Sequence, residues 1–202
     1  MHGRTRERPR RLGVFGGTFD PPHVGHLAVA RQLVETDDLD EIVWMPVRIP
    51  PHKPHRRVAP AGLRLEMVRA ATDGVEGQVV SDLELAREGP SYTVDTLRAL
   101  RSEYRDVDPV LILGADQFAE FSTWREPEEV ARLARLWVLA REGDDPSDVD
   151  PGVNVEWTPA HVSRVDVSSS EIRRRIREGE PFRHLVPEGV AEVIEREGLY
   201  RD

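Results

Sequence analysis

The sequence contains no cysteine. This absence excludes disulfide bonds, thiolate metal sites and a cysteine nucleophile. Lysine is almost absent as well, because Lys53 is the one lysine among 28 basic residues and the others are arginine. Long apolar runs are also missing, since none approaches the roughly 20 residues that a membrane-spanning helix needs. These absences leave a soluble globular chain without cysteine chemistry and with a single lysine, Lys53.

The charge of the chain restricts its partners. The formal net charge of −9 argues against bulk binding of nucleic acid, which needs a basic surface. Small phosphorylated ligands remain compatible, because one local cluster of positive groups can hold them. Residues 1–10 are basic but lack the apolar segment of a secretory signal, so we interpret them as a flexible leader of a cytoplasmic protein. We expect no membrane partner, and the sequence leaves a homo-oligomer open.

Short apolar runs alternate with segments of helical periodicity. The continuous apolar runs suit strands covered on both faces, as in a parallel sheet. The alternation predicts an α/β fold with an open, mostly parallel Rossmann-like sheet and helices on both faces. We expect one domain over residues 11–202, with the C-terminal helices packed on it. The expected strands are 11–15, 41–45, 78–83, 110–113, 136–139 and 153–157, and the expected helices are 24–34, 63–71, 92–104, 128–134, 170–178 and 187–197.

The segment VFGGTFDPPHVGH, residues 14–26, follows the first expected strand. Paired glycines there let the backbone turn tightly and approach a ligand. The start of the next helix offers free N–H groups and a positive dipole end, which suit an anion. His23 and His26 are three residues apart at that end and can donate hydrogen bonds or carry a charge near neutral pH. Because ligands bind at the carboxyl ends of parallel strands, this loop is expected to hold a nucleotide phosphate. The alternative is a surface turn with two incidental histidines.

A second candidate anion site is the segment VSSSEIR, residues 167–173. A serine-capped helix leaves backbone donors and hydroxyls free, and Arg173 lies one turn into it. Together with the histidine loop, this segment suggests the two ends of one triphosphate. The alternative is an ordinary serine cap followed by solvated arginines.

The loop GGTFDPPHVGH resembles the signature GxFDPxHxGH of the nucleotidyltransferase superfamily with the HxGH motif. Five more segments resemble the bacterial nicotinate-nucleotide adenylyltransferases: PPHK, SYTVDTL, LGADQF with the tryptophan that follows it, VDVSSSEIR and LVPEGVAEVIEREGLY. In order and spacing, the resemblance covers residues 11–200. It implies transfer of AMP from ATP to nicotinate mononucleotide, which gives deamido-NAD and pyrophosphate, with Mg²⁺ held mainly by substrate phosphates and water.

The resemblance also implies roles for individual residues. A flat pyridinium cation would stack on Trp124, and Thr93 would receive the nicotinate carboxylate. On their own, these two residues would more often be a packing residue and a helix cap, and Asp116 could be a cap too. The implied catalytic residues are His23, His26, Lys53 and Arg173. The implied ATP-binding residues are Gly16, Gly17, Thr18, Phe19, His23, His26, Ser169, Ser170 and Arg173, and the implied nicotinate-nucleotide-binding residues are His52, Lys53, Tyr92, Thr93, Asp116, Trp124 and Arg141.

The segment before PPHK departs from the family pattern. Many relatives have a polar, often asparagine-containing segment that helps to hold the acceptor phosphate, whereas residues 46–49 here read PVRI. Arg48 is a candidate to replace that contact. Two alternatives to the main interpretation remain open: the same superfamily chemistry on nicotinamide mononucleotide or another acceptor such as phosphopantetheine, and a nucleotide-binding regulatory module without catalysis.

Overall fold

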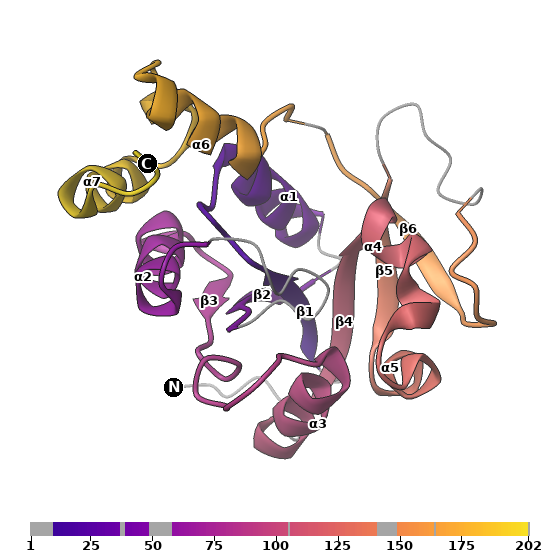
Figure 1. The fold of residues 1–202 in the computed structure, drawn as a ribbon. Helices are drawn as coiled ribbons and strands as arrows, with labels where there is room; N and C mark the ends of the chain where they lie inside the picture. The colour runs from indigo at the N-terminus through magenta and orange to yellow at the C-terminus, as the bar shows by residue number, and fades with distance from the viewer. Residues whose placement is uncertain are drawn as a thin grey trace, which may run out of the picture.

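The computed structural model describes residues 10–36, 39–48, 58–104, 106–140, 149–163 and 165–201. Strands and helices alternate along these ranges (Figure 1). The strands are β1 (Arg10–Gly17), β2 (Glu41–Pro46), β3 (Gln78–Val80), β4 (Val107–Gly114), β5 (Arg135–Ala140) and β6 (Trp157–His161). The helices are α1 (Val24–Glu35), α2 (Ala61–Thr72), α3 (Thr93–Glu103), α4 (Ala115–Ala119), α5 (Pro127–Leu133), α6 (Ser169–Glu178) and α7 (Glu188–Glu197).

The six strands form one sheet in the order β3-β2-β1-β4-β5-β6, and every pairing between neighbours is parallel. The chain runs outward from β1 to β3, returns to β4 beside β1, and then runs outward to β6. The strand order therefore reverses between β1 and β4. In such sheets this is the point where ligands bind, outside the carboxyl ends of the strands. The predicted α/β, Rossmann-like architecture is confirmed.

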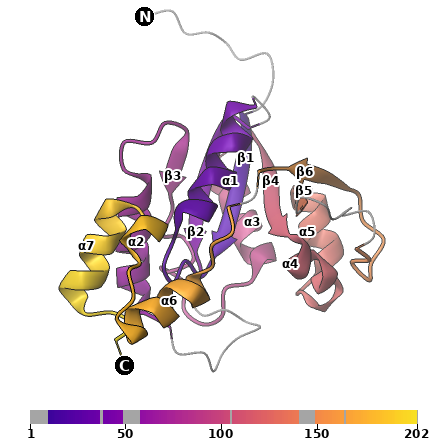
Figure 2. The same ribbon diagram turned by 90° about the horizontal axis from the view of Figure 1, so that it is seen from above.

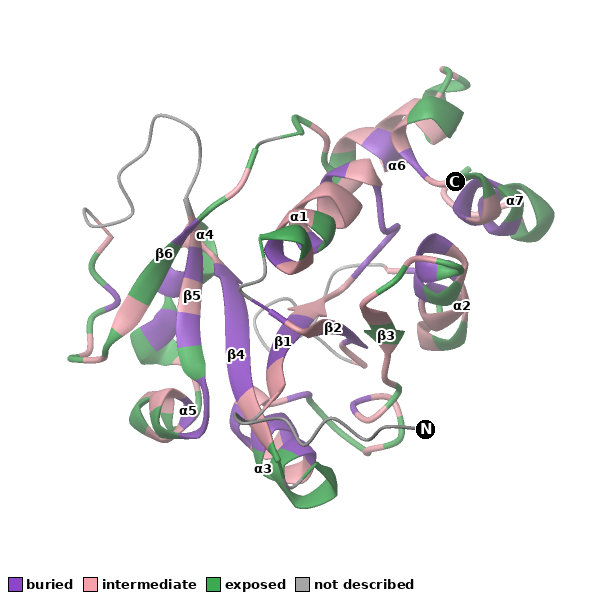
Figure 3. Ribbon diagram, turned by 180° about the vertical axis from the view of Figure 1, so that it is seen from behind, coloured by how far each residue is buried: buried purple, intermediate pink, exposed green. Residues whose placement is uncertain are grey.

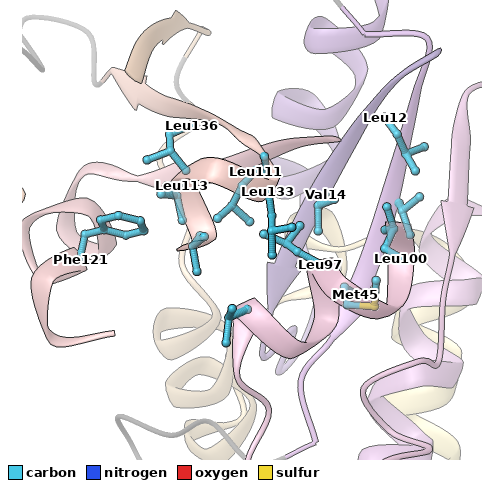
Figure 4. Close-up of a cluster of buried hydrophobic side chains, with 14 of the residues drawn as sticks. Leu12, Val14, Met45, Leu97, Leu100, Leu111, Leu113, Phe121, Leu133 and Leu136 are labelled. Carbon is cyan, nitrogen blue, oxygen red and sulfur yellow. The ribbon is translucent and has the colours of Figure 1, made fainter. Parts of the chain in front are cut away.

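Successive strand residues point to opposite faces of the sheet, and both faces are covered. On one face, Leu12, Val14 and Met45 pack with leucines of α3 and α5 (Figure 4). On the other face, Ile42 and Trp44 pack with residues of α1 and α2. Figure 3 shows a continuous buried stretch in β4, whereas β5 has buried residues alternating with partly exposed ones. Because β4 is buried on both sides, its sequence is a continuous apolar run rather than an alternating one.

The two C-terminal helices add a third layer outside α2. Met67 of α2 is fully buried and packs in a cluster with Ile172 of α6 and with Val190 and Ile194 of α7. Figure 2 shows α7 lying beside α2. This packing brings the end of the chain back to the loop that follows β1.

The structure corrects several expected boundaries. The last strand is β6 at Trp157–His161, so the expectation of a strand at 153–157 was wrong in position. Val153 and Val155 are apolar because they pack against the core, not because they pair with β5. The third strand ends at Val80, and α4 was not expected at all because five residues are too few for a periodic pattern. In addition, β1 begins at Arg10, inside the segment expected to be a leader. In the described part of the chain, no helix has both the length and the apolar character needed to cross a membrane.

Candidate active site

The loop that follows β1 is anchored by Phe19. Its backbone φ is 48° and its ring is buried, 5.6 Å from the ring of Phe15 and 5.1 Å from that of Trp44. Gly17 makes this arrangement possible, since a Cβ there would lie 2.9 Å from the Phe19 ring. The Phe19 ring in turn lies 5.3 Å from the ring of His26. The aromatic cluster therefore fixes the position of the second histidine.

His23 and His26 lie face to face at the start of α1. Their ring centroids are 3.7 Å apart and the ring planes differ by 29°. The backbone N–H of His23 donates to Nδ1 of His26 over 3.3 Å. That bond assigns the tautomer of neutral His26, because an Nδ1 that accepts leaves the proton on Nε2. His26 is thus set to donate from Nε2.

Burial keeps both imidazoles neutral at pH 7 in the free protein. It lowers the pKa of His23 from 6.5 to about 4. Burial and the neighbouring His23 lower the pKa of His26 well below 6.5. The expectation that these histidines carry a charge near neutral pH therefore needs correction. As neutral imidazoles they can still donate directed hydrogen bonds, and a bound anion would favour their protonation.

The start of α6 is tied directly to this loop. The Ser169 hydroxyl donates to the carbonyl of Pro21 over 2.9 Å, and Nη1 of Arg173 donates to the carbonyl of Asp20 over 2.6 Å. Gly25 allows the segment before α6 to approach, because a Cβ there would lie 3.2 Å from the carbonyl oxygen of Val165. Two segments far apart in the sequence thus form one surface rich in hydrogen-bond donors.

This surface lines a pocket, called here the histidine pocket, at the carboxyl end of β1. Every residue that the sequence assigned to ATP binding lines it: Gly16, Gly17, Thr18, Phe19, His23, His26, Ser169, Ser170 and Arg173. The guanidinium of Arg173 is largely buried, since the exposed fraction of its side chain is 17 %. Its donors are neutral groups and one arginine, which suit phosphate oxygens, and the carboxylates of Asp20 and Asp116 line the pocket as well.

A second pocket, called here the tryptophan pocket, adjoins the first. Tyr92, Thr93 and Trp124 line it, and α3 begins at Thr93. The first N–H groups of a helix have no partner within the helix, so the start of α3 offers donors to an anion. The guanidinium carbon of Arg125 lies 4.9 Å from the centre of the Tyr92 ring. This pocket therefore offers aromatic faces beside donors for an anionic group.

The two pockets share a wall at the point where the strand order reverses. Gly16, Gly17 and Thr18 after β1, and Asp116 and Gln117 in α4, line both of them. Two ligands bound in the two pockets would meet along this wall. Such an arrangement can align an acceptor with a nucleotide for group transfer.

Some residues expected at the site are not placed in it. His52, Lys53 and Arg141 lie outside the described residues. Arg48 is described, and its Nη1 donates to the carbonyls of Arg87 over 2.8 Å and Leu85 over 3.3 Å. Arg48 lines neither pocket, so its geometry gives no support to a contact with an acceptor phosphate.

Sequence reasoning missed two buried charged residues next to the pockets. Arg64 of α2 has an exposed fraction of 1 % and binds backbone carbonyls of the surrounding loops. Glu84 lines the tryptophan pocket and accepts from the Thr96 hydroxyl over 2.6 Å. Burial raises the pKa of Glu84, against the hydrogen bonds from Thr96 and Ser91. Arg64 left a signal in the sequence, because it takes a place on the apolar face of the helix together with Met67 and Ala71.

Comparisons with known proteins concern the chain as a whole rather than single residues of the site. Residues 14–175 match the family described as cytidylyltransferase-like. A protein of Desulfitobacterium hafniense named probable nicotinate-nucleotide adenylyltransferase is 41% identical over 200 residues, covering 96% of this chain and 97% of its own. One of the same name from Thermomicrobium roseum is 42% identical over 199 residues, covering 95% and 92%. The structure of Plasmodium falciparum nicotinic acid mononucleotide adenylyltransferase complexed with NaAD superposes with a TM-score of 0.79 at 17% identity, covering 95% of this chain and 97% of that one.

Proposed function

Since the chain belongs to the cytidylyltransferase-like family and, within it, to the nicotinate-nucleotide adenylyltransferases, we propose that it transfers AMP from ATP to nicotinate mononucleotide. The products are nicotinate adenine dinucleotide and pyrophosphate, so the enzyme acts in NAD biosynthesis. The observation that carries this function is the pair of pockets that share the wall of Gly16 and Asp116. One pocket suits a triphosphate and the other suits an aromatic, anionic acceptor.

The reaction needs alignment rather than a protein nucleophile. An oxygen of the acceptor's phosphate attacks the α-phosphorus of ATP in line, and the bond to the β-phosphate oxygen breaks as pyrophosphate leaves. His23 and His26 donate hydrogen bonds to phosphate oxygens as negative charge develops on the leaving group. Arg173, which lines the same pocket, would hold the phosphates with its guanidinium. Lys53, which the sequence places in the loop after β2, would add a compact positive charge.

Chemistry on ATP in this family generally uses a divalent cation, and we propose Mg²⁺. The residues that the structure describes include no group of three or more His, Cys, Asp or Glu able to hold a metal ion. Magnesium commonly binds through substrate phosphates and water with one or two carboxylates. Asp116 lines both pockets and is the carboxylate best placed to orient such a hydrated ion. The ion would neutralise the charge of the phosphates.

The acceptor pocket favours nicotinate over nicotinamide. Thr93 and the free N–H groups at the start of α3 are hydrogen-bond donors, and they suit a carboxylate. An amide in the same place would present its own NH₂ donors to them. Mismatched buried polar groups typically give discrimination of at least about 10²-fold.

A pyrophosphate-release assay with ATP and a panel of acceptors tests the proposed function. We expect turnover with nicotinate mononucleotide, at least about 10²-fold lower kcat/KM with nicotinamide mononucleotide, and none with phosphopantetheine. Equal kcat/KM values for the two pyridine nucleotides would show a dual-specificity enzyme. Binding of ATP without turnover on any acceptor would instead support a regulatory module.

A further inference from the structure

We propose that Arg64 is a positioning residue for the transfer reaction. Its buried guanidinium fixes the relative positions of the loops that surround the two substrates. This inference rests on the proposed function. Arg64 lines neither pocket, so it acts through the loops and not on the substrates.

The contacts of Arg64 join three loops. Nη1 donates to the carbonyl of Thr18 over 2.9 Å and to that of Val47 over 2.7 Å. Nη2 donates to the carbonyl of Arg48 over 3.1 Å, and Nε donates to that of Ala59 over 3.0 Å. These carbonyls belong to the loop after β1, the loop after β2 and the segment that leads into α2. One planar group therefore fixes three pieces of backbone.

Two of these loops form walls of the pockets. Thr18 lines both pockets, and Val47 lines the tryptophan pocket. A shift of the Thr18 loop relative to Val47 would change the distance between the nucleotide and the acceptor. Arg48 and Ala59 flank residues 49–57, which include Lys53, so the same guanidinium binds the backbone on both sides of that segment.

A second set of contacts runs through Asp20 and holds the same backbone. Its Oδ1 accepts from the N–H of Ala59 over 3.0 Å and from the hydroxyl of Tyr200 over 2.7 Å. Ala59 is thus held through its N–H by Asp20 and through its carbonyl by Arg64. Nη1 of Arg173 donates to the Asp20 carbonyl, which links this network to the histidine pocket.

The chemistry of arginine explains why this residue stands on an apolar helix face. Burial lowers the pKa of Arg64, and the nearby Asp20 carboxylate partly offsets that effect. A buried charge is costly unless hydrogen bonds satisfy it. The guanidinium supplies five donors in one fixed plane, whereas an ammonium supplies three donors around a single point. Lysine at this position would keep the charge but could not reach all four carbonyls in the same geometry.

Arg64→Lys tests the proposal, with Arg101→Lys as the matched control. Arg101 also donates from Nε to a backbone carbonyl, that of Leu133 over 2.8 Å, but it lines neither pocket. Steady-state kinetics are measured well below the melting temperature of each variant. We expect kcat of Arg64→Lys to fall by about 10²-fold with KM values changed by only a few-fold, because the groups that bind substrate remain while their alignment is lost. The Arg101→Lys variant should keep the parent kcat.

A purely structural role predicts a different result. In that case Arg64→Lys lowers the melting temperature but keeps the parent kcat below it, and the proposal fails. An equal loss of kcat in Arg101→Lys would also overturn it. If the wild-type protein releases no pyrophosphate, the proposed function is wrong. If the wild type is active but Arg64→Lys keeps its kcat, only the positioning role of Arg64 is wrong.

Tyr200→Phe keeps the test decisive if Arg64→Lys does not fold. This change removes the hydroxyl that binds Asp20 at the outer end of the network and leaves the ring in place. We expect kcat to fall at least about 3-fold with unchanged KM values, a smaller effect because Asp20 keeps its bond to Ala59. An unfolded Arg64→Lys together with a kinetically silent Tyr200→Phe would refute the positioning role.

Discussion

Lowering the pH from 7 to 5 should destabilise the protein through His23. In an unfolded chain a histidine has a pKa of about 6.5, whereas burial lowers the pKa of His23 to about 4 in the folded protein. Between these values the unfolded state binds a proton that the folded state does not. The free energy of unfolding therefore falls as the pH falls through this window. The neutral, buried His23 contributes fully to the stability of the folded protein only above pH 6.5.

The size of the effect follows from the two pKa values. Linkage gives a loss of about 2 kcal/mol of unfolding free energy between pH 7 and pH 5, and of about 3 kcal/mol at pH 4. His23 has an exposed fraction of 7 %, so solvent screening does little to reduce this effect. The lowered pKa of His26 acts in the same direction. Glu84 acts in the opposite direction. Its pKa is raised in the folded protein, so the folded state binds a proton more readily than the unfolded state, and the free energy of unfolding rises as the pH falls.

Urea unfolding of matched variants isolates the contribution of His23. The free energy of unfolding is measured at pH 7 and pH 5 for the wild type, for His23→Gln and for His161→Gln, which removes an exposed histidine of β6. We expect His23→Gln to lose about 2 kcal/mol less than the wild type over this interval, while His161→Gln behaves like the wild type. The same pH dependence in wild type and His23→Gln would show that the folded protein readily protonates His23, and our account of the neutral histidine pair would be wrong.

Substitutions at three further positions test the assigned roles. His26→Ala should lower kcat by about 10²–10³-fold, or roughly 3–4 kcal/mol, when measured at a temperature where the variant remains folded, and near-parental activity would contradict the assignment. Lys53→Arg should lower kcat/KM at least about 10-fold, because a wide planar fork replaces a compact charge. If Lys53→Arg is silent while Lys53→Ala is damaging, only the charge matters. Thr93→Val should reduce the preference for nicotinate over nicotinamide mononucleotide at least about 10-fold in competition assays, and an unchanged ratio would remove Thr93 from the acceptor site.

The fold could be predicted from the sequence because central strands that are covered on both sides have continuous apolar sequences. The run VLIL in β4 has no polar residue because all four of its side chains are buried, and in LWVL of β5 two side chains are buried and two pack partly buried against the core. The edge of the sheet was harder to predict. Within the described residues, β6 pairs only with β5, and it contains Pro159, which an edge strand tolerates because it has an unpaired side. Its sequence WTPAH therefore lacks the apolar signal that identified the central strands.

The sequence predicted which residues line the histidine pocket, but it did not predict the protonation state of the two histidines. The motif is local, so the sequence alone assigns its residues to one loop. The lowered pKa values of His23 and His26 depend on burial in the folded protein, and the ring of His26 packs not only on Phe15 and Phe19 of the motif but also on Trp44 of β2. The tryptophan pocket was accessible only through the family resemblance, because single residues such as Thr93 and Trp124 have no local pattern that distinguishes a ligand contact from a cap or a packing residue.

The buried polar network links catalysis to the end of the chain. Tyr200 lies beyond α7, yet its hydroxyl binds the carboxylate of Asp20 in the loop after β1. The apolar packing of α7 against α2 holds Tyr200 in place, and α2 also carries Arg64. The layer formed by α6 and α7 thus does more than cover α2, because it supports the backbone that both pockets share. When ligands bind at the carboxyl ends of the strands, loops carry the residues that contact them, and the positions of these loops decide how accurately the substrates are aligned. In this protein, hydrogen bonds from α2 and α6 to the backbone of the loop after β1 fix its position.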